Sequence, residues 1–154
     1  MKDVVEKLRT KGCTIATMES CTGGAVASAI TDIEGSSEVL KFSAVTYSNE
    51  YKIKMGVDKE IIDKYTVYSK ETAVSMAKSI SSFALSDYGI GITGKLNRID
   101  KNNLYGADNQ VFVCIYDKNE DKNYNLEILV DKNSRVENKE FIIQKIINKL
   151  IDII

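Results

Sequence analysis

The stretch Thr14–Gly24, TIATMESCTGG, determines how the first part of this chain folds. Thr14–Met18 is a short apolar run of the kind found in buried strands. The glycine pair Gly23-Gly24 then opens a run of small residues, 23–33, in which apolar residues recur at helical spacing. The stretch therefore predicts a strand, a turn that carries Ser20, and a helix.

Working outward from this unit, strands and helices alternate through the first two-thirds of the chain. The patterns predict helices at 4–10, 23–33, 58–65, 69–84 and 137–154, and strands at 14–18, 42–47, 88–93, 111–116 and 124–130. A polar turn at 117–122 joins the last two strands as a hairpin. We expect an α/β fold, a three-layer α/β/α sandwich with a mixed sheet and a C-terminal closing helix, in a single domain over 1–154.

The composition narrows the classes of function. The chain has 154 residues and a net charge of −1, so it offers no basic field for nucleic acid. No stretch approaches the roughly 20 apolar residues that cross a bilayer, and the N-terminus has no apolar signal region. The three cysteines follow no metal-binding or disulfide pattern. We expect a cytoplasmic protein with no metal, no nucleic-acid partner and no membrane partner.

Three segments point to one site. Ser20, Tyr47 and the pair Thr93-Gly94 each follow a predicted strand. In open α/β sheets ligands bind beyond the carboxyl ends of the strands, so these three loops are expected to converge on one crevice.

The chemistry available to Ser20 is restricted because the chain contains no histidine. A serine needs a base to become a nucleophile, and the Ser-His-Asp arrangement is excluded. The base must then be a lysine or a tyrosinate, and Lys52 is the best-placed candidate. Its ordinary pKa near 10.4 must fall by about three units, which requires burial or a neighbouring cation. Glu19 and Glu50 would oppose this fall, so we expect both carboxylates to point away from the lysine.

Each of these residues also has a purely structural interpretation. Ser20 can cap a helix, Lys52 can be a surface lysine, Tyr47 can pack on the sheet, and Asn49 can shape a turn. Cys21 is a rival nucleophile of higher intrinsic reactivity, although no histidine is present to activate it.

Several motifs in order resemble one family. They are Glu19-Ser20-Cys21-Thr22-Gly23-Gly24, Gly35-Ser36-Ser37, Val45-Thr46-Tyr47-Ser48-Asn49-Glu50-x-Lys52, Met55-Gly56-Val57, Tyr68-Ser69-Lys70-Glu71-Thr72-Ala73-x-x-Met76-Ala77 and Thr93-Gly94. Together they resemble the CinA C-terminal domain, which includes stand-alone nicotinamide mononucleotide deamidases. The resemblance covers residues 14–94 well and the remainder weakly.

The resemblance implies an amidohydrolase that converts nicotinamide mononucleotide to nicotinic acid mononucleotide and ammonia without a cofactor. It implies Ser20 as the nucleophile, Lys52 as its base and Tyr47 as an assisting residue, with oxyanion donors near Thr22–Gly24. It further implies self-association. The residues it implies for substrate binding are Cys21, Thr22, Gly23, Gly24, Ser36, Asn49, Thr93, Gly94 and Arg135.

The chain departs from the family after Thr93-Gly94. The family continues with a glycine-rich loop, whereas here bulky and charged residues fill Lys95–Gln110. Glu34 also replaces a proline before Gly35-Ser36-Ser37. The kept nucleophile segment favours an active enzyme, and the rewritten loop favours the alternative, a catalytically weak relative that binds a nucleotide or a protein partner.

Overall fold

A single mixed sheet forms the centre of the molecule. The computed structural model describes residues 1–154. Its strands are β1 (Ile15–Glu19), β2 (Leu40–Val45), β3 (Tyr88–Gly94), β4 (Gln110–Asp117) and β5 (Lys122–Leu129). They lie in the order β2-β1-β3-β4-β5. Strands β2, β1 and β3 run parallel, and β4 and β5 are antiparallel, so the predicted mixed sheet and hairpin are confirmed.

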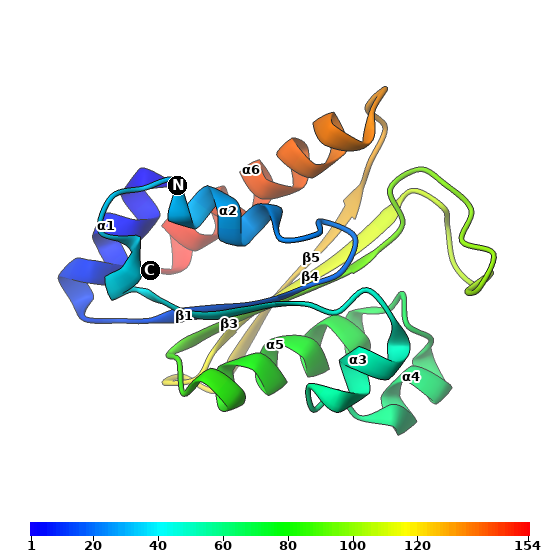
Figure 1. Cartoon of the computed structure of the whole chain (residues 1–154), viewed down its shortest axis with the longest axis horizontal. Helices are drawn as coiled ribbons and strands as arrows, with labels where there is room; N and C mark the ends of the chain where they lie inside the picture. Colours follow the sequence, from blue (N-terminus) through cyan, green and yellow to red (C-terminus); the bar gives the residue numbers. More distant parts are fainter.

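Helices cover both faces of this sheet. One layer holds α1 (Lys2–Lys11), α2 (Ala25–Thr31) and α6 (Arg135–Ile153), and the other holds α3 (Asn49–Lys54), α4 (Lys59–Tyr65) and α5 (Lys70–Ala84). A short 3-10 helix, η1 (Ser36–Glu38), precedes β2. Figure 1 shows the two helical layers above and below the sheet, which confirms the three-layer α/β/α sandwich.

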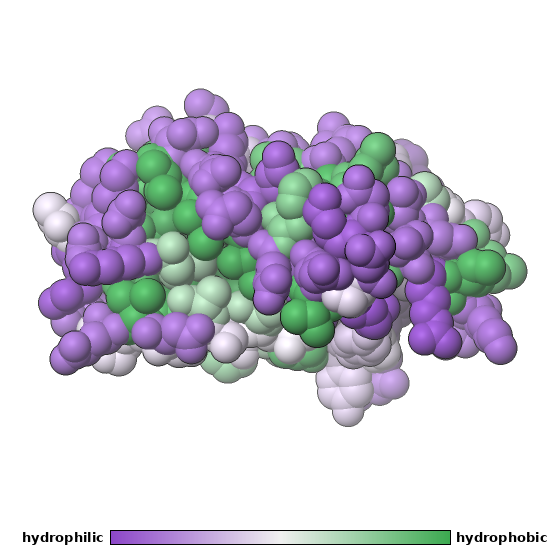
Figure 2. All heavy atoms as spheres, turned by 90° about the horizontal axis from the view of Figure 1, so that it is seen from above, coloured by the Kyte–Doolittle hydropathy of each residue, from purple (hydrophilic) through white to green (hydrophobic).

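The period of two along β1 divides the core between the two layers. Ile15 belongs to the larger buried cluster under α1, α2 and α6, whereas Ala16 and Met18 belong to the cluster under α5. The closing helix α6 buries Ile142, Ile146 and Leu150 against the sheet. Its polar side faces outward, and Figure 2 shows polar side chains over most of this face with apolar surface between them. No helix has the length and apolar character needed to cross a membrane.

Close packing of α5 on β3 depends on two glycines. A Cβ atom at Gly91 would lie 2.2 Å from the carbonyl oxygen of Ala73, and one at Gly89 would lie 2.1 Å from that of Ala77. Both distances are far inside van der Waals contact, so only glycine permits the helix to lie this near the strand. The position of β3, and therefore of the loop that follows it, depends on this approach.

The sequence patterns missed α3 and the 3-10 helix η1, and they placed the start of α2 two residues too early. Lys52 was expected on a turn, but it lies on α3, which Ser48 caps by accepting a hydrogen bond from the Tyr51 N–H at 3.3 Å. This helix buries a single side chain, that of Lys52, so it has no apolar stripe to reveal it. The second helix begins at Ala25 and not at Gly23, because both glycines adopt positive φ angles in the preceding turn.

Candidate active site

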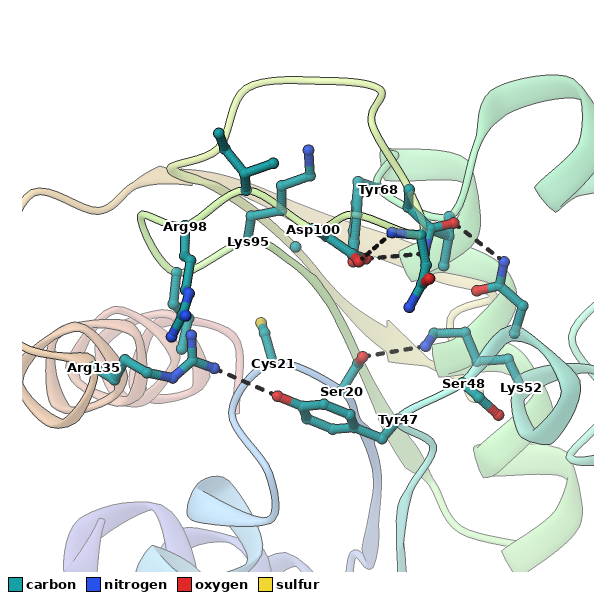
Figure 3. A pocket seen from close by; sticks show the side chains of 17 residues that line it. Ser20, Cys21, Tyr47, Ser48, Lys52, Tyr68, Lys95, Arg98, Asp100 and Arg135 are labelled. Carbon is teal, nitrogen blue, oxygen red and sulfur yellow. Dashed lines mark hydrogen bonds between the residues drawn. The ribbon is translucent and has the colours of Figure 1, made fainter.

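Loops that follow β1, β2 and β3 meet at the carboxyl ends of the parallel strands. They border a cavity of about 460 Å³ whose lining includes Ser20, Tyr47, Lys52 and Gly94. Arg135, the first residue of α6, lines the same cavity from the other helical layer. Figure 3 shows these side chains arranged around one hollow.

Ser20 and Lys52 are in direct contact within this cavity. The Lys52 amine donates a hydrogen bond to Ser20 Oγ at 3.1 Å and another to the carbonyl oxygen of Thr46 at 2.7 Å. Lys52 is only 2% exposed and Ser20 is 7% exposed. The strand–turn unit places the serine, and α3 turns the lysine inward toward it, so the two residues form a buried pair.

Burial alters the protonation of this lysine. Desolvation lowers the pKa of Lys52 to about 8, against opposing contributions from Cys21 and Asp100. Glu19 and Glu50 point elsewhere, as expected: Glu50 pairs with Lys54 at 2.6 Å, and Glu19 turns into the start of α2. A substantial neutral fraction of the amine is therefore available at mildly alkaline pH, which is what a general base requires.

The buried Glu19 holds the serine turn in place. Its carboxylate accepts hydrogen bonds from Thr22 Oγ1 at 2.7 Å and from the N–H groups of Gly24, Val26 and Ala27 at 3.1, 3.1 and 2.9 Å. A carboxylate at a helix N-terminus is electrostatically favourable. No pattern in the sequence indicated this role for Glu19.

This arrangement corrects the expected oxyanion donors. The Gly24 N–H donates to Glu19, and the Gly23 N–H donates to the carbonyl of Ser20 at 3.0 Å, so neither is free for a ligand. The Cys21 N–H donates to no loop or turn carbonyl, and Cys21 itself lines the cavity. The Thr22 N–H also donates to no loop or turn carbonyl, but Thr22 is fully buried and does not line the cavity. Of these residues, Cys21, directly after Ser20, is therefore the one that borders the cavity.

Cys21 is poorly suited to act as the nucleophile. Burial raises the pKa of its thiol to about 12, so the thiol stays protonated at neutral pH. Ser20 is the side chain that contacts the lysine.

Tyr47 and Asn49 lie at the rim of the cavity. Tyr47 is 67% exposed, and its hydroxyl accepts a hydrogen bond from Arg135 Nη2 at 3.4 Å. It makes no hydrogen bond to Ser20 or Lys52 (Figure 3). Asn49 Nδ2 donates to Asn103 Oδ1 at 3.4 Å.

Five of the expected binding residues do not line the cavity: Thr22, Gly23, Gly24, Ser36 and Thr93. Ser36 precedes β2 and so lies at the amino end of a parallel strand, at the opposite edge of the sheet from Ser20. Thr93 is fully buried and donates to the carbonyl of Val67 at 2.8 Å. The Thr22 hydroxyl donates its hydrogen bond to the Glu19 carboxylate.

The rewritten loop contributes cavity residues that sequence reasoning missed. Lys95, Arg98 and Asp100 all line the cavity, together with Tyr68 from the segment before α5. Asp100 accepts hydrogen bonds from the Tyr68 hydroxyl and, at 2.9 Å, from Asn103 Nδ2. The one sequence signal that pointed to Arg98 was the scarcity of arginine, because the chain has only three arginines and two of them, Arg98 and Arg135, line the cavity.

Comparisons with known proteins place the chain in a family. The sequence profile of the CinA C-terminal domain matches residues 1–151. The chain belongs to the CinA C-terminal domain family. A CinA-like protein of Kosmotoga olearia is 49% identical over 92 residues, and one of Desulforapulum autotrophicum is 45% identical over 94 residues. These matches cover 59% and 60% of this chain but only 22% of each relative's length.

Solved structures of the same family share the fold. The competence/damage inducible protein CihA of Agrobacterium tumefaciens superposes with a TM-score of 0.83 at 26% identity, covering 98% of this chain and 93% of that one. A competence or damage-inducible protein of Enterobacter asburiae gives a TM-score of 0.87 at 24% identity, covering 98% and 94%. The overall fold of this CinA-family chain therefore matches that of these solved structures.

Proposed function

We propose that this CinA-family domain is an amidohydrolase that deamidates nicotinamide mononucleotide through Ser20 and Lys52. The observation that carries the proposal is the buried amine 3.1 Å from Ser20 Oγ, with its pKa lowered to about 8. A neutral amine at this distance is within reach of the hydroxyl proton. The substrate is inferred from the family resemblance and from the cationic and polar lining of the cavity.

In the first half of the reaction, Lys52 takes the proton of Ser20 as Oγ attacks the carboxamide carbon. The hydrogen bond from Lys52 to the Thr46 carbonyl fixes one N–H, which leaves the lone pair of the neutral amine free to face the serine. The Cys21 N–H is the proposed donor to the developing oxyanion, because it follows the nucleophile, belongs to a cavity-lining residue and donates to no backbone carbonyl of a loop or turn.

The second half of the reaction releases both products. The protonated lysine returns its proton to the leaving nitrogen, ammonia departs, and the acyl group remains on Ser20. Lys52 then takes a proton from water, the hydroxide attacks the ester, and the serine regains its proton. One amide and one water thus give one carboxylic acid and one ammonia, with the enzyme restored.

Ammonia release from nicotinamide mononucleotide tests the proposal. We expect turnover by the unaltered chain, and no turnover by Ser20→Ala or Lys52→Met. Lys54→Met is the matched control, because Lys54 lies on the same helix with its side chain 59% exposed. A folded protein that binds the nucleotide without releasing ammonia would instead favour the binding-module alternative. Equal turnover by Ser20→Ala and the unaltered chain would refute the mechanism.

A further inference from the structure

The loop that replaces the glycine-rich segment brings charges of both signs into the cavity. Arg98 and Asp100 are two residues apart on this loop, and both line the hollow. In Figure 3 they lie on different sides of it: Arg98 extends toward Arg135, whereas Asp100 lies on the side of Tyr68 and Lys52. The cavity therefore has a cationic side and an anionic side.

The cationic side consists of two guanidinium groups without a carboxylate partner. Neither Arg98 nor Arg135 forms an ion pair, although the chain has 22 acidic and 21 basic residues. The only side-chain hydrogen bond of either is that from Arg135 to the Tyr47 hydroxyl. Arg135 also begins α6, a helix of 19 residues, so the positive end of its dipole adds to the same side. Two converging, unpaired guanidinium groups suit a phosphate dianion.

The anionic side is a carboxylate held in one orientation. Hydrogen bonds from Tyr68 and Asn103, and from the Asn102 N–H at 2.9 Å, lower the pKa of Asp100. The charge of Lys95 also lowers the pKa of Asp100, while Lys95 itself forms an ion pair with Asp108 at 3.0 Å. Asp100 thus remains charged at neutral pH, close enough to Lys52 to influence its titration.

We propose that the rewritten loop is the specificity element of this site, with Arg98 a second phosphate ligand beside Arg135 and Asp100 the counter-charge to a cationic ring at Ser20. This inference rests on the proposed function. An N-glycosylated nicotinamide ring is a pyridinium cation and its 5′-phosphate is a dianion, so a mononucleotide of this type matches both sides of the cavity. The lost glycines would thereby be replaced by side-chain recognition.

The test separates the two charges by varying the ligand. Binding is measured by calorimetry in the Ser20→Ala background, so that nothing is turned over. The three probes are nicotinamide mononucleotide, nicotinamide riboside, which lacks the phosphate, and the reduced mononucleotide, which has a neutral ring.

Each variant should then weaken a different pair of probes. Arg98→Gln should weaken both phosphate-bearing probes about tenfold or more and leave the riboside unchanged. Asp100→Asn, which can still accept from Tyr68, should weaken both pyridinium probes about three- to tenfold and spare the reduced form. Lys101→Gln is the control, because Lys101 is exposed on the same loop and does not line the cavity.

The outcomes separate this inference from the deamidase proposal. Charge-selective binding without ammonia release by the unaltered chain would remove the hydrolysis and leave the inference standing. Ammonia release with binding that Arg98→Gln and Asp100→Asn do not alter selectively would overturn the inference and leave the hydrolysis. Binding of none of the three probes would overturn the inference as well.

Discussion

Replacing Lys52 by methionine should make the protein more stable at neutral pH while removing its proposed activity. Methionine is unbranched and similar in length, so it can occupy the same buried space without a charge. The pKa of Lys52 falls from 10.5 to about 8 on folding, which corresponds to about 3 kcal/mol against the charged form. The loss of the hydrogen bond to the Thr46 carbonyl costs about 1 kcal/mol. We therefore expect Lys52→Met to raise the free energy of unfolding at pH 7 by about 1–2 kcal/mol.

The same argument predicts how this difference changes with pH. Because the folded pKa lies below the unfolded one, the unfolded chain binds more protons between pH 8 and 10.5, and the wild type gains stability as the pH rises through that window. The gain amounts to about 2.5 kcal/mol between pH 7 and pH 10. The methionine variant has no titrating group at this position and does not gain this stability. Its excess free energy of unfolding over the wild type should therefore shrink or reverse by pH 10.

Urea unfolding of both proteins at pH 7, 8, 9 and 10, in reducing buffer, measures this difference. Taking the difference between variant and wild type removes the titration of the tyrosines and cysteines that both share. Lys54→Met is the control, since its exposed pair with Glu50 should contribute less than about 1 kcal/mol with little change over the pH range. A difference for Lys52→Met that does not change with pH would refute the lowered pKa, and with it the argument for Lys52 as base.

Four further outcomes are expected. The kcat/KM for ammonia release should rise about tenfold per pH unit and level off above pH 8, because only the neutral Lys52 amine accepts a proton; a flat profile from pH 6.5 to 9.5 would contradict this. Cys21→Ser should retain turnover, because the buried thiol stays protonated, and a complete loss in a folded variant would count against Ser20 as nucleophile. Glu19→Gln should lower the free energy of unfolding by about 2–4 kcal/mol in urea titrations, because an amide cannot accept from all the donors that the carboxylate satisfies. Gly91→Ala should prevent folding or destabilise by about 3 kcal/mol or more, since its Cβ would lie 2.2 Å from a carbonyl oxygen; a thermal melt like that of the wild type would disprove the close packing of α5 on β3.

The order and type of most elements followed from local patterns. Alternating and helical periodicities identified the five strands and all the longer helices, because burial of one face leaves a regular trace in the sequence. Helix α3 shows no apolar periodicity in the sequence, because the one side chain that it buries is a lysine. The strand–turn–helix pattern of residues 14–33 likewise predicted the serine turn, but it gave no sign that the Glu19 carboxylate would accept hydrogen bonds from the amides at the start of α2.

The sequence by itself determined which residues could do chemistry here: a serine on a strand–helix turn, no histidine, and a lysine in a later motif of the family resemblance. Only the tertiary structure decided their state and their neighbours. Lys52 becomes a candidate base because folding buries its amine beside Ser20. Arg98 and Arg135 line the same cavity because the β3–β4 loop and the start of α6 lie at the same end of the sheet. Ser36 lies at the opposite end of the sheet because it precedes β2, whereas the cavity residues follow their strands. Burial and long-range electrostatics depend on the packing of distant segments, and no local pattern of residues carries that information.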